Sequence, residues 1–243
     1  MSVVRLALLL LFASCAGATP SPEDAGTDAG PPPRTHLDDC AAFASQGGVA
    51  TITAAVERLN ALPPPVNPAC FVASLPRPLE AVATTSLLSA QPAASRASPR
   101  VFLLLPGLVV SVVPEGAGAS LLEFGEWTST SRTLKGEVAF PLDGGLAPDA
   151  PFTRVHSNLG VTTCGLCHRN EVPHPSIDAG FVSDAFRPDP GTLVPMSEVA
   201  AQHAACGEGP VDAGSRCELF HALYDYGTVR QGAFSSDVAL FVQ

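Results

Sequence analysis

Three residues in the second half of the chain carry the side chains best suited to chemistry. Cys164, Cys167 and His168 stand in the order C-x-x-C-H within the stretch VTTCGLCHRNEVPHP. Two thiols at this spacing can close a disulfide, and with His168 and His174 they offer four ligands of the types that zinc prefers. The same order is the attachment signature of c-type haem, in which both thiols add to vinyl groups and the adjacent imidazole ligates iron.

The composition and the motifs argue against some classes of function but do not identify one. The chain has 13 basic and 23 acidic side chains, a net charge of −10, which argues against nucleic acid as a partner because phosphate binding needs clustered Lys and Arg. The motifs G-x-S-x-G and H-E-x-x-H and the phosphate loop do not occur in the sequence. We therefore expect the protein not to be an enzyme of these classes.

The N-terminus predicts export. Residues 1–18 contain one Arg, a short apolar run and then small residues, the pattern of a secretory signal peptide. The segment Phe12-Ala13-Ser14-Cys15 resembles the lipobox of bacterial lipoproteins, with Phe12 where an aliphatic residue is usual. That resemblance implies lipidation of Cys15 and a lipid anchor in a membrane, and Ala16 after it favours the outer membrane, with the protein facing the periplasm or the surface. Ordinary cleavage after Ala18 is the alternative. Residues 19–34, rich in Pro, Gly and Asp, predict a flexible tether.

The cysteines indicate an oxidising compartment. Seven are present, and six remain once Cys15 is lipidated or removed. Sequence order suggests the disulfides Cys40–Cys70 and Cys206–Cys217, although six cysteines allow fifteen connectivities. This pairing leaves Cys164 and Cys167 as the third possible pair.

Residues 35–243 are expected to form one folded domain of the α+β class, mostly β with flanking helices. Its core would be a small antiparallel β-sandwich or a barrel-like sheet. The expected parts are helices within 35–66, a β core at 67–141, a loop-rich haem-binding segment at 142–195 and a pair of C-terminal helices within 196–243. The expected strands are 70–75, 82–90, 100–105, 108–113, 119–124 and 133–141. Pro106-Gly107 would form the turn between two of them.

Through Cys164, Cys167 and His168 the chain resembles c-type cytochromes, and the resemblance extends to the export signal but to little else. It implies one covalent haem c with His168 as an iron ligand. The sixth ligand is left open between Met196, whose segment GTLVPM resembles the Pro-and-Met segment of small cytochromes in reversed order, and His156 upstream of the motif. His174, His203, His221 or an open position are the remaining choices. Arg154, Arg169 and Arg187 flank the motif as candidates for pairing with the haem propionates.

The expected function is therefore one-electron transfer at the cell envelope, by a monohaem lipoprotein that exchanges electrons with a redox partner protein. The main alternative is a non-redox lipoprotein, stapled by disulfides, that binds or scaffolds a partner. A haem protein with an open iron position, acting as a sensor or an enzyme, is a third possibility.

Overall fold

One large sheet organises the protein. The structure is a computed structural model and describes residues 35–157, 159–207 and 212–241; the expected signal peptide, Cys15 and the tether lie outside these residues. The described helices and strands, in chain order, are α1 (His36–Ala41), η1 (Ala42–Gln46), α2 (Ile52–Ala61), α3 (Pro68–Ala73), β1 (Leu79–Thr84), β2 (Arg100–Leu105), β3 (Leu108–Val112), β4 (Leu121–Trp127), β5 (Arg132–Ala139), α4 (Ala150–Val155), η2 (Thr163–Leu166), β6 (Val172–Pro173), β7 (Phe181–Asp184), β8 (Phe186–Arg187), η3 (Pro190–Thr192), β9 (Leu193–Val194), α5 (Met196–Ala204), α6 (Arg216–Tyr224), β10 (Val229–Gln231) and β11 (Ala239–Leu240).

The sheet has nine strands in the order β10-β1-β2-β3-β4-β5-β7-β6, with β9 also paired to β1. All its pairs are antiparallel except β1 with β10, and β8 pairs with β11 in a separate two-stranded sheet. The predicted α+β class is confirmed. Of the two forms expected for the core, a sandwich or a barrel-like sheet, the barrel-like form is not found, because the path of the described strands is open from β10 to β6.

The meander β2–β5 follows from the sequence pattern. Gly107 closes the β2–β3 turn with a φ of +83°, and a Cβ there would lie 2.8 Å from the carbonyl oxygen of Ala50. Glycine is therefore needed both for the turn conformation and for the close packing. This confirms the turn predicted at Pro106-Gly107.

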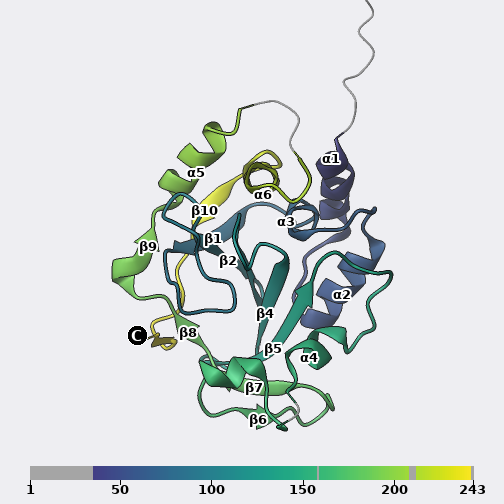
Figure 1. The fold of residues 1–243 in the computed structure, drawn as a ribbon, viewed down its shortest axis with the longest axis vertical. Coiled ribbons are helices and arrows are strands. Elements are labelled where there is room, and N and C mark those ends of the chain that lie inside the picture. The colour runs from purple at the N-terminus through teal and green to yellow at the C-terminus, as the bar shows by residue number, and fades with distance from the viewer. Residues whose placement is uncertain (1–34, 158, 208–211, 242–243) are drawn as a thin grey trace, which may run out of the picture. The chain divides into compact units, whose positions relative to one another are not determined.

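Helices cover one face of this sheet. The strand residues of that face are mainly aliphatic, with the aromatic Phe124 among them, and they form one core with residues of α1, α2, α3, α4 and α6. Figure 1 shows α1, α2 and α3 gathered on the same side of the strands. Gly136 of β5 allows this packing, since a Cβ there would lie 3.1 Å from the Pro151 side chain and 3.3 Å from that of Ile52.

Two predictions about elements are wrong. Residues 70–75, expected as a strand, belong mostly to α3: the Asn67 side chain accepts a hydrogen bond from the amide of Cys70, and Pro68 occupies the first turn. Every residue of α3 is buried, so its apolar run carries no helical period. Residues 142–195, expected as a long loop, contain α4 and the strands β6–β9, of which β7 pairs with β5. Such short strands form by pairing with a larger sheet rather than by their own propensity.

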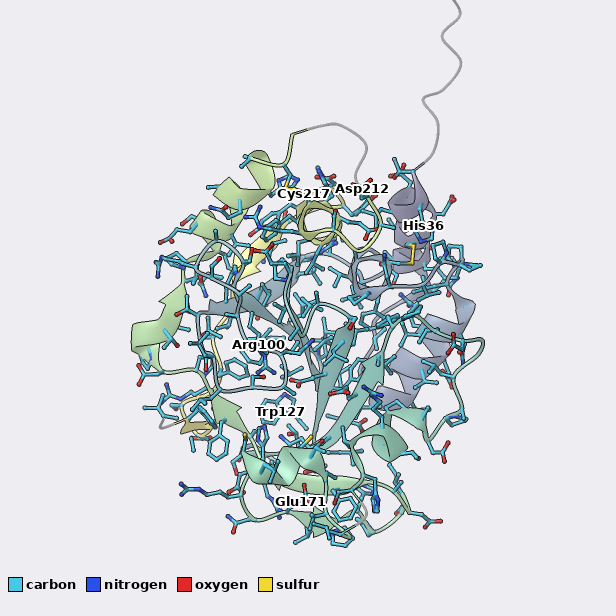
Figure 2. All side chains as sticks on the ribbon, viewed as in Figure 1. His36, Arg100, Trp127, Glu171, Asp212 and Cys217 are labelled. Atoms are coloured by element: carbon cyan, nitrogen blue, oxygen red, sulfur yellow. A yellow bond between two sulfur atoms is a disulfide. The ribbon has the colours of Figure 1, made fainter. Side chains whose placement is uncertain are left out.

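The two predicted disulfides are present and hold helices together. Cys40 of α1 is bonded to Cys70 of α3, near the labelled His36 in Figure 2. Cys206, just after α5, is bonded to Cys217 of α6. The expected C-terminal helix pair is therefore present, and it is cross-linked.

Candidate functional site

The face of the sheet that the helices leave free forms the floor of a cavity. Side chains alternate between the faces along each strand, so every second residue of β2–β5 points to this side. The cavity is lined from these strands by Arg100, Phe102, Val109, Ser111, Glu123, Gly125, Trp127, Thr133, Lys135 and Glu137. This face is polar and aromatic where the other is mainly aliphatic, which marks it as a surface for a ligand rather than for a helix. In Figure 2, Arg100, Trp127 and Glu171 follow one another from the middle of the sheet toward its β6–β7 end.

The C-x-x-C-H segment lies at the wall of this cavity. Cys164, Cys167 and His168 all line it, together with Val155 and Thr163. The segment forms a tight turn, in which the carbonyl oxygen of Cys164 accepts hydrogen bonds from the amides of Cys167 at 3.1 Å and His168 at 2.8 Å. The structure thus brings the three residues of the motif together at one cavity.

Glu171 and Thr162 fasten this turn. The Thr162 hydroxyl accepts a hydrogen bond from the amide of Gly165 at 3.2 Å, which caps η2. The Glu171 carboxylate accepts hydrogen bonds from the Thr162 amide, at 2.7 Å, and from the Thr162 hydroxyl. Because hydrogen bonds to a carboxylate are stronger than neutral ones, Glu171 closes residues 162–171 into a defined loop.

The ring of His168 is oriented by strand β7. Its Nδ1 lies 2.7 Å from the carbonyl oxygen of Asp184, and the ring stacks on Phe186 with centroids 5.5 Å apart. No described residue makes a hydrogen bond to Nε2 of His168. Burial, followed by the charge of Lys135, lowers the pKa of His168 to about 3. The ring is therefore neutral, and donation from Nδ1 to Asp184 leaves the lone pair on Nε2.

Lys135 is a buried cation beside this ring. Its ammonium donates to the Thr133 hydroxyl at 2.6 Å and lies 3.3 Å from Nδ1 of His168. Gly125, directly opposite Lys135 on β4, leaves space above the sheet at this point. Burial lowers the pKa of Lys135 to about 8, so the side chain is mainly charged at pH 7.

Both thiols of the motif are free. Cys164 is half-buried and Cys167 is exposed, and the structure has no bond between them. Burial raises the pKa of Cys164 to about 11, so its thiol is protonated at neutral pH. A zinc site would need both thiols as thiolates, together with His168 and His174. His174, the fourth ligand of that alternative, does not line the cavity.

The lining of the cavity combines aromatic side chains with charged ones. Its volume is about 200 Å³, below the about 300–1,000 Å³ of common ligand pockets, and it is open to solvent on one side. Its aromatic lining residues are Phe102, Phe124, Trp127, Phe186, Phe234 and Phe241. With two thiols and an imidazole at the wall, the residues present fit a covalently attached haem.

Neither candidate for the sixth ligand reaches the cavity. Met196 is a buried core residue at the start of α5, where its carbonyl oxygen accepts a hydrogen bond from the Tyr224 hydroxyl at 3.1 Å. His156 is exposed and contacts Phe181. Among the described residues that line the cavity, His168 is the one His, and none is Met. The structure therefore does not bring Met196 or His156 together with His168.

Of the three flanking arginines, Arg187 alone lines the cavity, and its Nε donates to the carbonyl oxygen of Val238 at 2.8 Å. Arg154 pairs with Glu137 at 2.9 Å, and Arg169 is exposed away from the lining residues. Arg100 lines the cavity as well, but its guanidinium is already bonded to Ser89, Ser111 and Glu123. Arg187 is thus the flanking arginine best placed to meet a propionate.

Sequence reasoning missed Lys135, Glu171 and the wall residue Phe186. A signal for Lys135 was available: Thr133, Lys135 and Glu137 alternate with the apolar Leu134 and Val138, which places a Lys on one face of a central strand. No comparable signal existed for Glu171 or Phe186, because their roles depend on how the loop folds back on the sheet.

The chain matches no protein-family model, no curated protein and no solved structure. Among the helices of the described residues, none has the length and apolar character needed to cross a membrane.

Proposed function

We propose that the protein is an exported monohaem c-type cytochrome that transfers single electrons at the cell envelope. The observation that carries the proposal is the state of His168 beside the two free thiols. The ring is neutral, Nδ1 is engaged by Asp184, and Nε2 keeps its lone pair, as an iron ligand must.

In this proposal Cys164 and Cys167 would hold the cofactor through thioether bonds, and His168 would ligate the iron. The bound haem would supply a one-electron Fe(III)/Fe(II) couple. The chain's own contribution is to orient the imidazole through Asp184 and Phe186. The aromatic walls exclude water, and Lys135 keeps a positive charge next to the ligating ring.

The edge of the site is accessible to a partner protein. Cys167 is exposed, and its neighbour Leu166 is 88% exposed. In this proposal the redox partner would contact the protein at this exposed edge. The anchor at Cys15 remains part of the proposal and would hold the protein at the outer membrane.

Covalent haem staining on a denaturing gel tests the proposal. The full chain is expressed in a strain that matures c-type haem and compared with the Cys164→Ala/Cys167→Ala variant. We expect a stained band for the wild type and none for the variant, while the control Cys206→Ala/Cys217→Ala keeps its stain. A wild-type chain without stain in that strain would overturn the proposal and leave the non-redox lipoprotein, whose binding site would be the same cavity.

A specific observation also favours a haem protein with an open iron position. Neither Met196 nor His156 lines the cavity, and among the described lining residues His168 is the one His and none is Met. Carbon monoxide is added to the reduced, folded protein that carries haem, and the spectrum separates the two cases. A rapid spectral change at low gas concentration supports an open position, and an unchanged spectrum supports a sixth protein ligand and plain electron transfer.

A further inference from the structure

A cluster on the C-terminal helix pair, outside the cavity, combines two imidazoles with one carboxylate. His203 lies in the last turn of α5, His221 lies in α6, and Asp225 caps the end of α6. Nε2 of His203 lies 2.6 Å from one oxygen of Asp225, and Nδ1 of His221 lies 2.7 Å from the other. Each residue offers a ligand atom within 4.8 Å of the other two.

We propose that His203, His221 and Asp225 bind one divalent first-row transition-metal ion, for which zinc is the test ion. Two imidazole nitrogens and a carboxylate oxygen are ligands that zinc prefers, and a site with three protein ligands completes its tetrahedron with water. At bond lengths of about 2.0–2.1 Å, tetrahedral ligand atoms lie about 3.3 Å apart. Each nitrogen therefore needs to move about 0.6–0.7 Å away from its carboxylate oxygen to admit the ion, a change within reach of side-chain rotation.

The framework around the cluster is already ordered. The Cys206–Cys217 disulfide cross-links the two helices beside it. The ring of His203 stacks on Tyr224 at 5.3 Å, and the Tyr224 hydroxyl donates to the carbonyl oxygen of Met196. Both imidazoles are thus held in place before an ion arrives, which reduces the entropy cost of binding.

The cluster is also accessible, and its rings can present lone pairs. The side chains of Asp225 and His203 are 41% and 26% exposed, whereas that of His221 is 11% exposed. Nε2 of His221 is buried without a hydrogen-bond partner, so a change of tautomer breaks no hydrogen bond at that atom. Nδ1 of His221 can therefore turn from donating to Asp225 to ligating a cation.

The second cluster of this kind provides a matched control. His36 lies beside Cys40 and Cys70, but both sulfurs are oxidised to a disulfide and cannot serve as thiolate ligands. The His36 ring instead lies 2.8 Å from the carbonyl oxygen of Pro65. The variant His36→Gln thus removes one imidazole from the chain without touching the proposed site.

Zinc content tests the inference in the full chain. Protein is equilibrated with micromolar zinc, dialysed, and analysed for zinc per chain by mass spectrometry, and its thermal midpoint is measured with and without zinc. All chains are also made in the Cys164→Ala/Cys167→Ala background, which removes the thiols as competing ligands. We expect about one zinc per chain and a raised midpoint, both lost in His203→Gln and in Asp225→Asn and both kept in His36→Gln.

Two results would overturn the inference. Zinc that stays bound in His203→Gln and Asp225→Asn lies elsewhere, and zinc that is absent from the wild type shows that the cluster is only a hydrogen-bonded network. If one variant fails to fold, the other decides, since the two residues lie on different helical segments. Neither result bears on the haem stain, so the two proposals stand or fall separately.

Discussion

The Nδ1 atom of His168 lies 2.7 Å from the carbonyl oxygen of Asp184, the residue that ends β7. Strand β7 pairs with β5, so that Ser183 lies opposite Thr133 of β5 and Asp184 lies opposite Arg132 of β5. The position of the imidazole is therefore set by the register of two strands and not by its own loop. A backbone acceptor cannot be removed by a side-chain substitution, so the orientation of His168 is tied to the integrity of the sheet edge.

The depressed pKa of His168 predicts a loss of stability in acid. The folded chain binds this proton only near pH 3, whereas the unfolded chain binds it near pH 6.5. As the pH falls from about 6.5 to about 3, the unfolded state gains the extra proton and the free energy of unfolding decreases. Above pH 6.5 this contribution is fully present. We expect the His168→Gln variant to lose less stability than its parent between pH 7.5 and pH 4.5.

Urea unfolding at the two pH values measures this difference. Both chains carry Cys164→Ala/Cys167→Ala, so that iron ligation does not hold the ring. The carboxylates titrate equally in both chains and cancel in the comparison. Equal losses of stability in the two chains would show that His168 is protonated as easily in the folded state as in the unfolded one.

Removal of the positive charge of Lys135 is expected to change the reduction potential of the proposed haem. A positive charge next to the ligating ring opposes the extra positive charge of the ferric state, so it favours reduction. Lys135→Met removes the charge while keeping much of the volume, and we expect the midpoint potential at pH 7 to fall, on the order of tens of millivolts. Spectroelectrochemical titration of the folded protein that carries haem measures the potential. Lys135→Arg is the control that keeps the charge, and a potential unchanged in Lys135→Met would contradict this role.

The sequence predicted the parts of the molecule that rest on local chemistry. The turn at Gly107 follows from a residue type that has few alternatives, and the two disulfides follow from pairing cysteines in sequence order. The strands from β2 to β5 follow from alternation and turn residues. The sequence also singled out Cys164, Cys167 and His168 by their order, and the structure brings these three residues together at one cavity.

Contacts between segments far apart in the chain could not be predicted from the sequence. Strand β7 exists because it pairs with β5, and α3 is so fully buried that its apolar run looks like a strand. Met196 was a candidate ligand because its segment GTLVPM resembles the Pro-and-Met segment of small cytochromes, yet it is buried in the core at the start of α5. No pattern within a single segment reports which face of a sheet that segment will cover.

The hydrogen bonds from Thr162 to Glu171 are expected to keep the loop of residues 162–171 ordered. Its carboxylate accepts hydrogen bonds from the amide and the hydroxyl of Thr162, and Glu171→Gln replaces one acceptor oxygen with a donor. We expect a loss of about 1–2 kcal/mol in the stability of the loop, because hydrogen bonds to charged groups contribute about 1.5–3 kcal/mol. Faster amide exchange at Thr162 and Gly165, together with a weaker haem stain, reports the change. Glu115→Gln, an exposed acid elsewhere, is the control, and identical exchange in the two variants would show that Glu171 does not hold the loop.

The two disulfides predict unequal losses of stability. Cys40 and Cys70 are 30 residues apart and Cys206 and Cys217 are 11 apart, so the first bond restricts the unfolded chain more. In the chain-entropy description, Cys40→Ala/Cys70→Ala costs about 3.5 kcal/mol and Cys206→Ala/Cys217→Ala about 2.5–3 kcal/mol. Cys40 and Cys70 are also fully buried, which adds a packing loss to the first pair. Chemical denaturation of the two variants gives the order, and a larger loss from Cys206→Ala/Cys217→Ala would mean that the C-terminal helix pair depends on its cross-link for more than chain entropy.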